Sequence, residues 1–134
     1  AVGTDVVKVK SALRVVLADE VKRISSLRAS VISKLAEDQA KLQSVFDQHG
    51  ADFGIIERWN PTIVKDKFVG ALQNHINSSD VQVIAGTYRN QSAIHFYNPK
   101  TYVNLVTYPD GNLWTGWKLG IEQARNLSLR GNLQ

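Results

Sequence analysis

The spacing of apolar residues changes once along this chain, and no other feature constrains the fold as strongly. Before residue 80, apolar residues recur every three or four positions, which is the spacing of an amphipathic helix. From residue 81 to residue 119 they alternate with polar residues, as in a half-buried strand. Helices followed by strands predict an α+β fold in which helices cover one face of a sheet.

The first helical region spans residues 5–48 and contains no proline. This region predicts either one long helix or two helices joined near Ser25 and Ser26. Thr4 is the expected N-cap and Gly50 the expected terminator. The apolar stripe of such a long region requires a partner surface.

A second helix is expected after Asn60, Pro61 and Thr62, extending to Asn77. A proline in the first turn costs little because its missing N–H would have no partner there. Four alternating segments with short connectors then predict a four-stranded antiparallel meander. The segments are VQVIAGTYR, SAIHFY, TYVNLVTY and NLWTGWKL, and a short closing helix is expected over residues 122–129, ended by Gly131.

Length and composition narrow the functional classes. The 134 residues correspond to one ordinary domain, and no apolar run approaches the roughly 18 residues that cross a bilayer. The chain has no cysteine, which excludes disulfides and thiolate metal sites. It also has no methionine, even at position 1, which indicates a piece of a longer polypeptide. Residues 1–34 are therefore interpreted as a helical lead-in, separate from the domain formed by residues 35–134.

The net charge of +4 is distributed unevenly. Residues 1–80 are nearly balanced, whereas residues 81–134 hold five basic and two acidic side chains. Such a surface attracts polyanions such as nucleic acid, although it is equally compatible with a solvated surface that aids solubility. The basic residues of this half are Arg89, Lys100, Lys118, Arg125 and Arg130.

Most enzyme signatures are absent from the sequence. It contains no HExxH, no histidine pair at helical spacing, no D-x-D cluster, no G-x-S-x-G elbow and no phosphate-binding GxxxxGK[ST] loop. The reactions that are still compatible with this sequence need only acid and base groups, cationic side chains and hydroxyl groups. RNA cleavage is the foremost example because the ribose 2′-OH supplies the nucleophile. An imidazole can take the proton of this hydroxyl group, and Lys or Arg can hold the phosphate oxygens.

The three histidines differ in their predicted surroundings. His49 stands at the end of a helical segment beside Gly50, where its ring is expected to reach the surface or a cleft; alternatively it only complements the helix dipole. His75 is interpreted as a boundary residue of the second helix. His95 alternates with Ala93 and Tyr97, so it is either a second member of a site or a structural strand histidine.

The last predicted strand, LWTGWKL, is rich in tryptophan. It is either a central strand packed on both faces or a strand that places an indole and a hydroxyl at a pocket, where the indole stacks on a base. Simple alternation puts Leu113, Thr115, Trp117 and Leu119 on one face and Trp114, Gly116 and Lys118 on the other.

The order of several short segments resembles the nuclease domain of the colicin D family, which includes bacteriocins and contact-dependent inhibition toxins. The resemblance covers about residues 45–134. The leading helices show no matching motif. The segments are HGADFGI, NHI, VIAGTYR, AIHFYNPKT, VNLV, DG, TGWKL, EQ and RGNL.

The resemblance implies a toxin that is secreted from, or displayed on, its producer and acts in the cytoplasm of a competing bacterium. There it would cut transfer RNA in the anticodon loop without a metal or other cofactor, leaving a 2′,3′-cyclic phosphate and a 5′-OH, and so halt translation. It also implies a tightly bound immunity protein, expected to be acidic. Residues 35–134 would then be the nuclease domain.

The same resemblance assigns site residues. It makes His49 the catalytic histidine, and it places Thr115 and Trp117 in the active site, with Lys118 completing that motif. The family's colicin members carry lysines just before this histidine, whereas residues 46–48 here are Phe, Asp and Gln. The substrate-binding groups expected to replace them are Lys41, Lys65, Lys67, Arg89 and Lys118, with His95 as a further candidate.

Two alternatives remain open from the sequence. One is a noncatalytic helical binding or assembly module of a larger secreted protein, in which the N-terminal apolar stripe makes the contact. The other is a toxin of the same fold that cuts a different RNA, such as ribosomal RNA.

Overall fold

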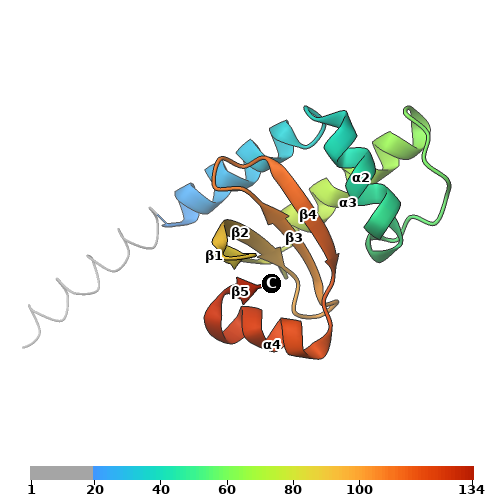
Figure 1. Ribbon diagram of the computed structural model, residues 1–134. Coiled ribbons are helices and arrows are strands. Elements are labelled where there is room, and N and C mark those ends of the chain that lie inside the picture. Colours follow the sequence, from blue (N-terminus) through green and yellow to red (C-terminus); the bar gives the residue numbers. More distant parts are fainter. Residues whose placement is uncertain (1–19) are drawn as a thin grey trace, which may run out of the picture.

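The computed structural model describes residues 20–134, in which a five-stranded sheet lies between two helical layers (Figure 1). One layer comprises a helix over residues 20–34, α2 (Gln39–His49) and α3 (Ile63–Asn77). The other layer is α4 (Ile121–Arg130). The α+β prediction is confirmed. The expectation that helices cover one sheet face is wrong, because α4 buries Ala124 and Leu127 against the second face.

Each layer has its own apolar core. The first core joins the N-terminal helices to the sheet, and its fully buried members include Val31, Leu42, Phe68, Phe96 and Leu105. The second core joins α4 to the opposite sheet face. Val31 belongs to the region interpreted as a lead-in, yet it packs in the first core; the boundary at residues 34 and 35 stays a prediction.

The sheet has the strand order β4-β3-β2-β1-β5. The first four strands form the predicted antiparallel meander. The prediction of only four strands is wrong, because a fifth pairs with β1 in parallel and makes the sheet mixed. The strands are β1 (Gln82–Tyr88), β2 (Gln91–Tyr97), β3 (Val103–Thr107), β4 (Leu113–Lys118) and β5 (Asn132–Leu133).

The fifth strand depends on a close contact between two glycines. Gly131 ends α4 with φ of 71°, as predicted for a helix terminator, and its carbonyl accepts a hydrogen bond of 2.9 Å from Thr87 N. A Cβ on Gly86 would lie 1.9 Å from that carbonyl oxygen, so only glycine fits at this position of β1. A two-residue strand is too short for alternation to indicate it.

The N-terminal helical region breaks at residues 35–38, not near Ser25 and Ser26, both of which are helical. Asp38 caps α2 by accepting a hydrogen bond of 3.0 Å from Lys41 N. Thr4, the predicted N-cap, lies outside the described residues.

Two further helix boundaries concern Gly50 and Asn60. Gly50 is the C-cap of α2, as predicted, but it has right-handed φ of −56° and begins the 3-10 helix η1 (Gly50–Phe53), which itself ends at Gly54 with φ of 86°. The start of α3 is as predicted, since Asn60 Oδ1 accepts from Thr62 N at 3.0 Å and from Val64 N at 3.3 Å.

Within residues 20–134, no helix combines the length and apolar character needed to cross a bilayer.

Candidate active site

His49 occupies the last position of α2, which contacts edge strand β4. The buried side chains Leu42, Val45 and Phe46 fix this helix in the first core. Immediately after His49 the chain tightens into η1, where a Cβ on Gly50 would lie 2.9 Å from Cδ2 of Phe46. The His49 side chain remains 28% exposed, so its ring is available to a ligand.

The imidazole of His49 lies beside the indole of Trp117 on β4. Their ring centroids are 6.1 Å apart, and the ring planes are inclined by 36°. The indole is also held by α4, because Trp117 Nε1 donates a hydrogen bond of 3.2 Å to Gln123 Oε1 near the start of that helix. The structure therefore brings together the two rings that the sequence resemblance paired.

A register shift in β4 changes which residues share a face. Thr115 pairs with Val106, but the next pair joins Leu113 to Thr107, leaving Trp114 as the extra residue. The predicted grouping is therefore wrong in two places: Leu113 joins the first core, whereas Trp114 packs in the second core together with Trp117. Thr115 and Trp117 still share a face, which is the opposite face from Leu113.

Asp52 is the member of the site that sequence reasoning missed. Its Oδ2 lies 3.9 Å from Nδ1 of His49 and accepts a hydrogen bond of 3.0 Å from the backbone N–H of Lys118. The distance of 3.9 Å is too long for a hydrogen bond between Asp52 and His49. Asp52 therefore ties the histidine to the end of the tryptophan strand. The i, i+3 spacing of His49 and Asp52 in HGAD was the available signal.

Of the predicted substrate-binding cations, Lys118 directly follows Trp117 in β4, is exposed, and donates its backbone N–H to Asp52. Arg89 is connected to Trp117 through Tyr88. The guanidinium carbon of Arg89 lies 5.3 Å from the ring centroid of Tyr88, and the ring centroids of Tyr88 and Trp117 are 5.6 Å apart. Lys65 and Lys67 lie near the start of α3, where Lys67 forms a 2.9 Å ion pair with Glu57.

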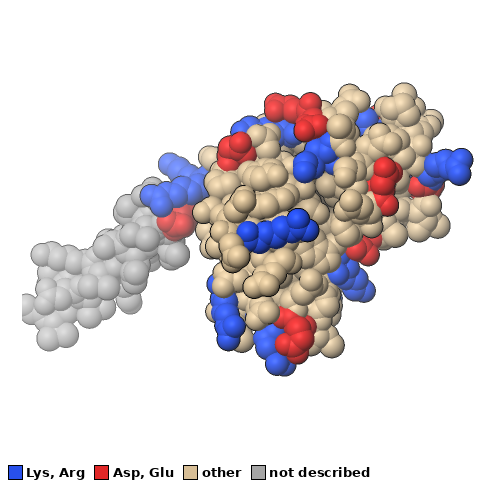
Figure 2. Space-filling model, viewed as in Figure 1, with Lys and Arg blue, Asp and Glu red and all other residues tan. Residues whose placement is uncertain are grey.

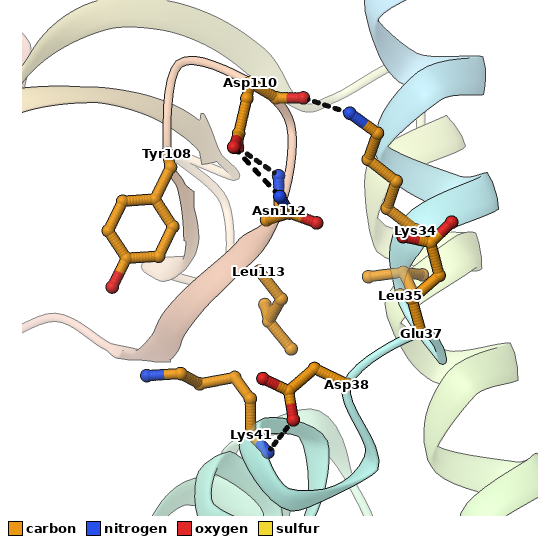
Figure 3. Close-up of a pocket in the computed structure, with 9 residues that line it drawn as sticks. All are labelled: Lys34, Leu35, Glu37, Asp38, Lys41, Tyr108, Asp110, Asn112 and Leu113. Atoms are coloured by element: carbon orange, nitrogen blue, oxygen red, sulfur yellow. Dashed lines mark hydrogen bonds between the residues drawn. The ribbon is translucent and has the colours of Figure 1, made fainter.

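Lys41 lines a separate cavity of 530 Å³ between the N-terminal helices and the β3–β4 turn (Figure 3). Lys34 crosses this cavity to donate to the backbone carbonyl of Asp110. Glu37, Asp38 and Asp110 also line it, so its acidic groups outnumber its lysines. This balance disfavours phosphate binding in this cavity.

His95 is fully buried in the sheet, unlike His49. Its Nε2 donates to Thr87 O at 2.9 Å, and its Nδ1 accepts from Asn104 Nδ2 at 3.0 Å. Burial lowers the pKa of His95, partly offset by the Thr87 hydrogen bond. The ring has the surroundings of a structural strand histidine, which was the alternative interpretation.

Figure 2 shows acidic and basic side chains interspersed over the viewed face, without one continuous basic patch. In the described part of the chain, no group of three or more histidine and carboxylate side chains is arranged to hold a metal ion.

Comparisons with known proteins agree on one family. The family model described as Colicin D matches residues 41–127, a range that includes His49, Asp52, Thr115 and Trp117. Colicin-D from Escherichia coli is 32% identical over 73 residues, covering 54% of this chain and 10% of that protein. This chain therefore spans only about a tenth of that relative's length.

A solved structure shows the same similarity in three dimensions. It is described as a ribonuclease from Escherichia coli complexed with its inhibitor protein. The match has a TM-score of 0.59 and 26% identity, and it covers 67% of this chain and 97% of that chain. Taken with the match to more than half of the sequence, these findings show that the chain belongs to the colicin D family.

Proposed function

We propose that this chain is the ribonuclease part of a bacterial toxin and that it cleaves transfer RNA in the anticodon loop. The observation that carries the proposal is the pairing of His49 with Trp117 at a centroid distance of 6.1 Å, with Asp52 beside both elements. Membership of the colicin D family and the similarity to a solved ribonuclease support the same activity.

In the proposed reaction the substrate supplies its own nucleophile. The 2′-OH loses its proton as O2′ bonds to phosphorus, and the bond to the 5′ oxygen breaks as that oxygen gains a proton. His49 serves as the base that takes the first proton or as the acid that gives the second. The products are a 2′,3′-cyclic phosphate and a 5′-OH.

The neighbouring residues position the RNA for this step. The Trp117 indole, held by Gln123, offers a ring on which a base can stack, and Thr115 shapes the same face of β4. Lys118 is the proposed contact for the phosphate oxygens, and Arg89 is a further cation beyond Tyr88. Together these groups supply one proton carrier, a stacking surface and positive charge, and none of these roles requires a metal or other cofactor.

A toxin of this kind needs an inhibitor in the cell that makes it. The solved relative is a ribonuclease complexed with its inhibitor protein, which supports a cognate immunity protein for this chain. Because the proposed site presents cations for phosphate, we expect that inhibitor to be acidic. We further propose that the toxin is released or displayed by its producer and acts in the cytoplasm of the target bacterium.

Incubation of the chain with total bacterial RNA, in the presence of a chelator, tests the substrate and the metal requirement together. We expect the loss of discrete transfer RNA bands, with sequenced ends that map to the anticodon loop. Cuts in ribosomal RNA would replace the proposed target, and an unchanged RNA pattern would favour a noncatalytic binding module. His49→Ala prepared in parallel controls for contaminating nucleases.

A further inference from the structure

A second cavity, with a volume of 330 Å³, opens next to the site, and apart from Asp52 and Lys118 the residues that line it have no part in the proposed reaction. Its apolar walls come from Phe53, Ala71 and Val103, and Asp52 and Lys118 also line it. The volume falls in the range of small-ligand sites, roughly 300–1,000 Å³. The cavity is therefore large enough to receive a nucleobase.

Asp52 lines this cavity and also lies beside His49, so the cavity adjoins the site. One of its carboxylate oxygens lies 3.9 Å from His49 Nδ1 and 3.0 Å from the backbone nitrogen of Lys118, which follows Trp117. An RNA strand whose scissile phosphate lies at His49 can therefore place an adjacent nucleotide in the cavity. This step rests on the proposed function.

Two groups in the β2–β3 turn offer hydrogen-bond donors to the cavity. Asn98 lines it, and its Oδ1 already accepts a hydrogen bond of 2.9 Å from Lys100 N, so its amide nitrogen is the group that can donate. Thr101 also lines it, and its Oγ1 accepts from Val103 N at 3.3 Å, which leaves the hydroxyl hydrogen to donate.

His75 offers a hydrogen-bond acceptor to the cavity, in contrast to the two donors. Its Nε2 lies 2.7 Å from the carbonyl oxygen of Phe96, which can only accept, so Nε2 carries the hydrogen. Burial lowers the pKa of His75, although the Phe96 hydrogen bond opposes this effect, and the ring is therefore neutral at pH 7. Nδ1 of this cavity residue is then a hydrogen-bond acceptor.

We infer that this cavity binds the base of a nucleotide flanking the scissile phosphate and selects uracil or guanine over cytosine and adenine. Uracil and guanine each carry a carbonyl beside a ring N–H, which match the donors of Asn98 and Thr101 and the acceptor of His75. Cytosine and adenine carry an amino group beside an unprotonated ring nitrogen. They would therefore set donor against donor and acceptor against acceptor.

Asn98→Asp is a conservative protein variant for testing this inference. The aspartate keeps an oxygen to accept from Lys100 N, so the turn is preserved, but it replaces the donor with an acceptor. Asn126→Asp, on the exposed surface of α4, is the matched control for the added negative charge. Each protein cleaves RNA hairpins with randomised loops, and the ends of the products are sequenced.

We expect the unmodified chain to favour uracil or guanine at one position next to the cut by roughly tenfold, on the scale of one base contact. Asn98→Asp should lose or reverse this preference, and Asn126→Asp should retain it. No preference in the unmodified chain, or the same preference in both variants, would overturn the inference. Absence of His49-dependent cleavage by the unmodified chain would instead overturn the proposed function.

A change in the substrate gives a second test that does not depend on the folding of a variant. At the favoured position, 3-methyluridine lacks the ring N–H, whereas 5-methyluridine keeps it and carries its methyl group on another edge. We expect the unmodified chain to cleave the first RNA roughly tenfold more slowly than the second. Equal rates would contradict the assignment of His75 as the acceptor.

Discussion

The end of α2 and the centre of the sheet each hold a histidine, and the two rings have opposite surroundings. His49 is 28% exposed and lies 3.9 Å from a carboxylate, whereas His95 is fully buried with both nitrogens in hydrogen bonds. A proton carrier must exchange protons with a substrate, which only the first location allows. The comparison shows that access and free bonding capacity separate a catalytic histidine from a structural one.

The largest effect on stability is expected from His95→Leu. This substitution leaves Thr87 O and Asn104 Nδ2 without their partner in the core, at a cost of ~1–3 kcal/mol for each buried group. We expect the free energy of unfolding to fall by about 2–6 kcal/mol in a denaturant titration. A loss below 0.5 kcal/mol, comparable to His49→Ala, would remove the structural distinction between the two rings.

A smaller effect is expected from pH. The pKa values of His75 and His95 are lowered from 6.5 by burial, so the unfolded chain binds more protons than the folded chain below that pH. Stability should therefore decrease as the pH falls from 6.5 to 5, and thermal unfolding at a series of pH values measures the decrease. A melting temperature that rises on acidification through this window would contradict the direction assigned to both histidines.

The smallest effect is expected from Asp52→Asn, which keeps an acceptor for Lys118 N but removes the charge beside His49. Because the His49 and Asp52 side chains are both partly exposed, the contact contributes only modestly, and we expect kcat/KM to fall about threefold. Asp47→Asn, an equal charge change on the exposed surface of α2, should leave kcat/KM unchanged. Equal values for the two variants would remove Asp52 from the site.

The sequence predicted those parts of the fold that depend on local patterns. Asn60 and Pro61 marked the start of α3, alternation located four strands, and Gly131 marked the end of α4. Tertiary contacts determine the parts that were missed. β5 forms because Gly86 has no side chain and Gly131 can therefore approach it closely. The pattern of a two-residue strand cannot indicate such a contact.

The site shows the same division. The resemblance paired His49 with Trp117, and the structure places their rings side by side. Asp52 was visible in the sequence, but its bond to Lys118 N joins residues 66 positions apart and could not be read from spacing. The extra residue in β4 reversed the predicted face of Trp114, because simple alternation assumes an unbroken register.

The central claim, that the imidazole of His49 moves a proton on RNA, is tested most directly by the single-turnover cleavage rate of His49→Ala with and without added imidazole. We predict a folded protein that cleaves its RNA about 10² to 10⁴ times more slowly than the unmodified chain and that regains activity as imidazole is added. Cleavage by folded His49→Ala at the unmodified rate, without imidazole, would contradict the claim.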